Sequence, residues 1–79
     1  KAEANQQQKV DSHPVIRPGV QGSYVREIQT LLKQKGYYAG NVDGKFGKGT
    51  TEAVKSFQGA NGLKADGKVG KETWAMLLK

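Results

Sequence analysis

The sequence contains two similar stretches of eight residues, Asp43-Gly44-Lys45-Phe46-Gly47-Lys48-Gly49-Thr50 and Asp66-Gly67-Lys68-Val69-Gly70-Lys71-Glu72-Thr73. An Asp-Gly pair is typical of a tight turn, because the carboxylate accepts hydrogen bonds from backbone N–H groups just ahead and glycine adopts a positive φ without strain. We expect Phe46 and Val69 to pack in the core. Gly47 and Gly70 should lie at or beside the N-caps of the helices that follow. The repeat therefore predicts two equivalent turns, each followed by a helix.

A first helix is predicted upstream of these turns, over residues 23–35. Its apolar residues recur at helical spacing and are Val25, Ile28, Leu31 and Leu32. We place Gln29 with the polar residues of the opposite face. Ser23 is the expected N-cap, and Gly36 should end the helix in the left-handed conformation.

Two more helices are predicted after the turns, over residues 48–60 and 71–78. The residues expected to face the core are Ala53, Val54, Phe57, Trp74, Leu77 and Leu78. The predicted fold is all-α, a small three-helix bundle with two pseudo-repeated Asp-Gly turns.

The N-terminal stretch differs in composition from the rest. Residues 1–14 contain three consecutive glutamines and one β-branched apolar residue, Val10, which is too little apolar surface to offset the entropy of ordering them. We interpret residues 1–14 as a flexible linker or tail and residues 15–79 as the domain. Val15 and Ile16, which lie between two prolines, should extend along the domain surface.

Composition excludes several classes of function. The 79 residues include 13 basic and 7 acidic side chains, for a net charge of +6, which favours anionic partners. The chain has no cysteine, and its single histidine, His13, falls in the predicted linker, so no thiolate or His-based catalytic or metal site is expected. We expect no cofactor, no metal, no catalysis and no membrane span.

The candidate ligand-binding residues lie in and around the two turns. They are Tyr38, Asn41, Lys45, Phe46, Lys48, Lys68 and Lys71. The lysines, glycine-rich backbone N–H groups and helix starts could form a rim that accepts a carboxylate, and Tyr38 could stack on a sugar face or a peptide. The alternatives are solvated lysines and an ordinary, partly exposed tyrosine. For Asp43, Gly44, Asp66 and Gly67 we favour a structural role in the turns over direct ligand contact.

These residues resemble the peptidoglycan-binding domain family, whose three-helix modules are appended to bacterial and phage cell-wall hydrolases. The resemblance covers about residues 19–79. It rests on residues 25–32, Gly36-Tyr37, Gly40, residues 43–47, Thr50, Ala53-Val54, Phe57-Gln58, Gly62-Leu63, Asp66-Gly67, Val69-Gly70 and Thr73-Trp74. Lys48 and Lys71 depart from it, because the family often has proline there.

The resemblance implies a non-catalytic module that binds peptidoglycan through its stem peptide or glycan. It implies an upstream catalytic domain in the same chain, such as an amidase or muramidase of an autolysin or endolysin, and a monomer that acts outside the cell or in the wall, secreted or released by phage. The composition leaves two alternatives open, a small basic nucleic-acid-binding domain and a module that docks on its parent enzyme.

Overall fold

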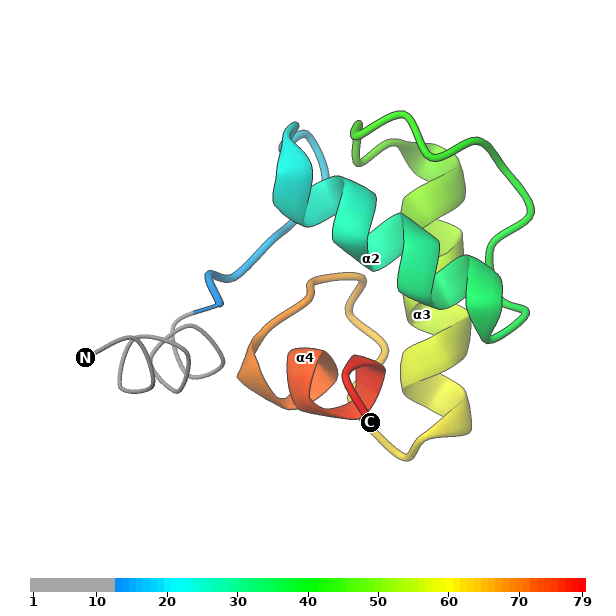
Figure 1. Ribbon diagram of the computed structural model, residues 1–79. Helices are drawn as coiled ribbons and strands as arrows, with labels where there is room; N and C mark the ends of the chain where they lie inside the picture. Colours follow the sequence, from blue (N-terminus) through cyan, green and yellow to red (C-terminus); the bar gives the residue numbers. More distant parts are fainter. Residues whose placement is uncertain (1–12) are drawn as a thin grey trace.

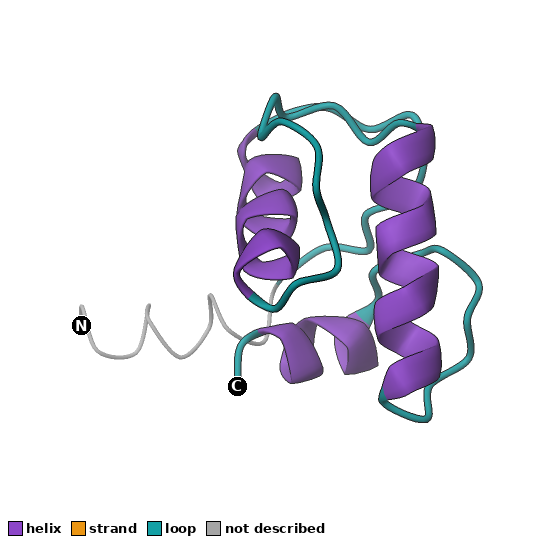
Figure 2. Cartoon of the chain, turned by 90° about the vertical axis from the view of Figure 1, so that its right-hand side faces the viewer, coloured by secondary structure: helices purple, strands orange, loops and turns teal. Residues whose placement is uncertain are grey.

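A computed structural model describes residues 13–79 and places three helices in them (Figure 1). These are α2 (Ser23–Gln34), α3 (Lys48–Ala60) and α4 (Lys71–Leu77). Helix α2 crosses α3, and α4 lies beneath α2 beside the C-terminal end of α3, an arrangement that the side view in Figure 2 also shows. The predicted all-α, three-helix fold is confirmed. Within residues 13–79 no helix has the length and apolar character needed to cross a bilayer.

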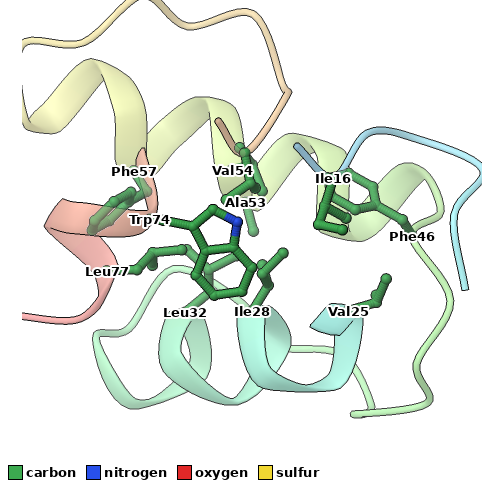
Figure 3. Close-up of a cluster of buried hydrophobic side chains, with 11 residues drawn as sticks. Ile16, Val25, Ile28, Leu32, Phe46, Ala53, Val54, Phe57, Trp74 and Leu77 are labelled. Atoms are coloured by element: carbon green, nitrogen blue, oxygen red, sulfur yellow. The ribbon is translucent and has the colours of Figure 1, made fainter. Parts of the chain in front are cut away.

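The core fills the space where the three helices and the two turns meet. Its buried apolar residues are Ile16, Val25, Ile28, Leu32, Phe46, Ala53, Val54, Phe57, Val69, Trp74 and Leu77. Figure 3 shows the Trp74 indole in the middle of this cluster, with side chains of α2 on one side and of α3 on the other. Phe46 and Val69 are buried, as the repeat predicted. The third helix, by contrast, ends at Leu77, so Leu78 is 38% exposed and its predicted inward position is wrong.

Glycines, rather than polar residues, occupy the N-cap positions of α2, α3 and α4. Gly47 and Gly70 occupy the N-cap positions of α3 and α4, as predicted. Ser23 is the first residue of α2 rather than its cap; the cap is Gly22, which has no side chain to accept a hydrogen bond. At the other end of α2, Gly36 has a φ of 88°, so the predicted left-handed stop is confirmed. The N–H of Tyr37 then donates to the carbonyl of Leu32 at 2.8 Å.

The segment that leads into α2 ties both turns together. Ile16 pairs with Val69 as an isolated antiparallel bridge, with N–H to carbonyl distances of 3.0 and 2.7 Å in the two directions. A few residues later, a second bridge joins Gln21 to Lys45. The segment from Ile16 to Gln21, which turns at Gly19, therefore contacts both copies of the repeat and fixes them relative to each other.

The folded part begins earlier in the chain than the sequence predicted. The His13 ring lies 4.2 Å from the Trp74 ring between centroids, and the indole N–H of Trp74 donates to the carbonyl of Pro14 at 2.8 Å. His13 and Pro14 therefore pack on the domain, and their predicted place in a linker is wrong. Ile16 is buried as expected, whereas Val15 is 56% exposed. Residues 1–12 of the predicted linker lie outside the described residues.

Candidate ligand-binding site

A buried glutamine holds the first Asp-Gly turn. The side-chain carbonyl of Gln29 accepts the N–H of Gly44 at 2.9 Å. Its amide nitrogen lies 3.0 Å from each of three acceptors, Asp43 Oδ1, the carbonyl of Lys45 and Thr50 Oγ1, which share its two hydrogens. Because the backbone N–H of Gly44 can only donate, the orientation of the glutamine amide is fixed.

A second glutamine holds the second turn with the same set of contacts. The carbonyl of Gln58 accepts the N–H of Gly67 at 3.0 Å. Its amide nitrogen lies 3.1 Å from Asp66 Oδ1, 2.7 Å from the carbonyl of Lys68 and 3.1 Å from Thr73 Oγ1. We call Gln29 with residues 43–50 the first unit and Gln58 with residues 66–73 the second unit.

The aspartates complete both networks. Asp43 Oδ1 accepts the N–H of Lys45 at 3.0 Å, and Asp66 Oδ1 accepts the N–H of Lys68 at 2.9 Å. These backbone hydrogen bonds, helped by the glutamine amides, lower the pKa of both carboxyl groups below the usual aspartate range. Both aspartates therefore stay ionised and act as acceptors that brace the turns.

Sequence reasoning missed the two glutamines. Gln29 is 0% exposed rather than part of the outer face, and Gln58 is 1% exposed. The spacing hid the equivalence, because Gln29 precedes its aspartate by 14 residues and Gln58 precedes its own by 8. The available signal was a glutamine in the helix that precedes each turn, because a buried polar side chain in a small core needs partners.

The two units differ in what lies over the glutamine. In the first unit the Tyr38 hydroxyl lies 3.4 Å from the amide nitrogen of Gln29 and donates to the carbonyl of Asn41 at 2.7 Å. The ring passes so close to Gly40 that a Cβ there would lie 2.8 Å from the hydroxyl oxygen. Tyr38 is half-buried, and its neighbour Tyr37 packs edge-on against Phe57 with centroids 5.4 Å apart.

Two open grooves flank these units. The larger, with a volume of about 390 Å³, belongs to the second unit. It is lined by Val15, Gln58, Leu63, Lys64, Asp66, Lys68, Gly70, Lys71, Glu72 and Thr73. The smaller, of about 330 Å³, lies between the two tyrosines and α3. Its lining residues are Tyr37, Tyr38, Ala39, Gly40, Gly49, Glu52, Ala53 and Ser56.

The structure divides the predicted ligand-binding residues among these places. Lys68 and Lys71 line the larger groove, and Tyr38 lines the smaller one. Three more residues, Asn41, Lys45 and Lys48, are exposed but line neither of these two grooves. Phe46 is only 2% exposed, so its side chain is part of the core and the prediction that it contacts ligand is wrong.

The chain is thus a small three-helix module in which a buried glutamine holds each of two turns and an open groove lies beside each turn. A model of the family described as "Putative peptidoglycan binding domain" matches residues 21–77, and the chain belongs to this family. The resemblance seen in the sequence is thereby confirmed.

Relatives of this chain include longer enzymes. It is 47% identical over 68 residues to the spore cortex-lytic enzyme of Bacillus cereus, covering 86% of this chain and 26% of the enzyme. It is 46% identical over 52 residues to the N-acetylmuramoyl-L-alanine amidase CwlM of Mycobacterium tuberculosis, covering 66% of this chain and 13% of the amidase. The chain thus spans about a quarter, or less, of the length of these relatives.

A solved structure supports the same relationship in three dimensions. The N-terminal domain of SleB matches with a TM-score of 0.83 and 46% sequence identity, covering 85% of this chain and 92% of that domain. The match extends over nearly the whole of that domain.

Proposed function

We propose that this chain binds peptidoglycan without cleaving it and holds an attached cell-wall hydrolase at its substrate. The observation that carries the proposal is the family match over residues 21–77, together with the presence of this module in wall-lytic enzymes such as the spore cortex-lytic enzyme. A tethered module raises the local concentration of its enzyme at an insoluble polymer even when it binds weakly.

The electrostatics of the chain support binding rather than hydrolysis. Its net charge of +6 suits an anionic wall polymer. General acid catalysis by a carboxyl group calls for a raised pKa, whereas the turn hydrogen bonds lower the pKa of Asp66, the aspartate of the larger groove. The Asp66 carboxylate instead stabilises the second turn by accepting the N–H of Lys68.

The same proposal leads to expectations about the protein of which this module is a part. We expect a catalytic domain in the same chain, an amidase or another wall hydrolase, and action at the cell wall outside the membrane. The module should work as a monomer, and we expect it not to bind nucleic acid. The alternative functions are nucleic-acid binding, which the net charge of +6 would permit, and docking on the parent enzyme.

Co-sedimentation separates these functions. Purified sacculi, freed of protein and nucleic acid, should pellet the chain in a saturable manner, and soluble muropeptides should compete. A DNA mobility-shift assay at the same salt concentration serves as the comparison. A shift of DNA without pelleting on sacculi would favour nucleic-acid binding, and binding of neither would point to the parent enzyme as the partner.

A further inference from the structure

The second unit is open at the position where the first is closed. The backbone N–H groups of Tyr37 and Leu63 make the same helix-ending bond, each at 2.8 Å, to the carbonyls of Leu32 and Gln58. The next residue is Tyr38 in the first unit and Lys64 in the second. Tyr38 covers its glutamine, whereas Lys64 is exposed and lines a groove that reaches Gln58.

The open groove combines positive charge with a small apolar wall. Three lysines, Lys64, Lys68 and Lys71, line it against two carboxylates. One of the carboxylates, Asp66, already accepts the turn N–H of Lys68. Leu63 and Val15 supply the aliphatic surface, and none of the ten lining residues is aromatic.

This lining suits a peptide better than a sugar. Sugar rings are usually held by stacking on an aromatic side chain, and the aromatic rings near the grooves line the smaller one. A short peptide with a free carboxylate and small aliphatic side chains matches lysines beside leucine and valine, because an ammonium–carboxylate pair supplies charge-assisted hydrogen bonds while the aliphatic wall covers methyl groups.

We propose that the groove of the second unit binds a carboxylate of the peptidoglycan stem peptide, with Lys64, Lys68 and Lys71 as its cationic partners. The first unit, closed by Tyr38, is its structural counterpart and does not hold the peptide. The proposal rests on the proposed function and adds which face of the module, and which part of the polymer, make the contact.

The repeat supplies a matched control for the test. Lys68 and Lys71 in the second unit correspond to Lys45 and Lys48 in the first, so the double variants K68E/K71E and K45E/K48E change the net charge equally. All four side chains are exposed, and both variants should melt near the wild-type temperature. We expect K68E/K71E to weaken pelleting on purified sacculi about tenfold or more, as loss of charged hydrogen bonds does, and K45E/K48E to change it less than about twofold.

A third variant tests the open groove itself. Lys64→Tyr places in the second unit the residue that closes the first, and it should weaken binding as much as K68E/K71E does. Wild-type chain that fails to pellet on sacculi would refute the proposed function and this assignment together. Wild-type pelleting with equal losses in both double variants, or with undiminished binding by Lys64→Tyr, would overturn the groove assignment alone and leave the proposed function standing.

Discussion

Gln29 and Gln58 hold equivalent positions in two hydrogen-bond networks, although they stand at different distances from the turns they serve. Each side-chain carbonyl accepts the N–H of the glycine after an aspartate, at 2.9 Å for Gln29 and 3.0 Å for Gln58. Each amide nitrogen reaches that aspartate, the carbonyl two residues beyond it and a buried threonine. No buried side-chain nitrogen or oxygen in residues 13–79 lacks a partner, so both networks are complete.

Replacement of either glutamine by leucine should destabilise the domain. Leucine has a similar size but leaves the N–H of Gly44 or Gly67 buried without an acceptor, and it removes the donor that the aspartate and threonine share. Each unsatisfied group costs about 1 to 3 kcal/mol, so we expect Gln29→Leu or Gln58→Leu to lower the free energy of unfolding by about 2 to 4 kcal/mol. Urea denaturation measures the change. Gln34→Leu, at an exposed position of α2, is the control, and equal stabilities of all three variants would refute the structural role of the networks.

Acid should weaken the same turns. The folded state lowers the pKa of Asp43 and Asp66, chiefly through the backbone hydrogen bonds from Lys45 and Lys68, so the folded state binds protons less readily than the unfolded chain. Their contribution to stability is therefore present above the unfolded pKa, about 3.9, and is lost as the pH falls through the lower folded value. Melting temperatures from pH 6 to pH 2 should show this fall. The double variant D43N/D66N should show a shallower fall, and a slope identical to wild type would contradict this assignment.

Trp74 should be the most sensitive position of the core. Its side chain is 2% exposed, packs against His13 and donates to the carbonyl of Pro14, so it joins α4 to the start of the domain. Truncation of a buried aromatic to alanine costs about 3 to 5 kcal/mol, which is most of the stability of a domain of this size. Trp74→Ala should therefore be largely unfolded by circular dichroism at room temperature. Leu78→Ala, at the exposed end of the chain, should fold normally, and a cooperative melt of Trp74→Ala near the wild-type temperature would contradict this prediction.

Two glycine-to-alanine changes should have opposite signs. Gly67 has a φ of 80°, and this left-handed backbone alone should make Gly67→Ala cost about 1 to 2 kcal/mol of stability. A Cβ there would also lie 3.1 Å from the Thr51 methyl carbon, which is a tight contact. Gly59 lies within α3, and a Cβ there would meet no other atom within 4 Å, so Gly59→Ala should stabilise by about 0.5 to 1 kcal/mol. Differential scanning calorimetry resolves both changes. A stabilised Gly67→Ala variant would mean that the second turn does not hold the conformation described.

Local features of the fold could be read from the sequence, and contacts between distant segments could not. The spacing of Val25, Ile28 and Leu32 predicted α2, because helical periodicity is a property of neighbouring residues. The burial of Gln29 depends instead on a turn 14 residues away, and the packing of Pro14 depends on Trp74, 60 residues away. Patterns within a helix or a linker carry no sign of such partners.

The candidate site was likewise predicted only in part. Lys68 and Lys71 were identified from the repeat and do line a groove, whereas Lys45 and Lys48, identified by the same reasoning, do not line either of the two grooves. The repeat makes the two lysine pairs look alike. The surroundings of the two pairs differ, because Tyr38 lies beside Gln29 in the first unit and Lys64 lines the groove of the second.

The most direct test of the binding mode is chemical-shift mapping of the ¹⁵N-labelled chain with a soluble muropeptide that carries a free carboxylate. The account predicts saturable shifts of backbone amides from Leu63 to Glu72, with amides from Lys45 to Gly49 unchanged. Shifts confined to the first unit or to the outer face of α2, or no shifts at muropeptide concentrations that displace the chain from sacculi, would contradict it.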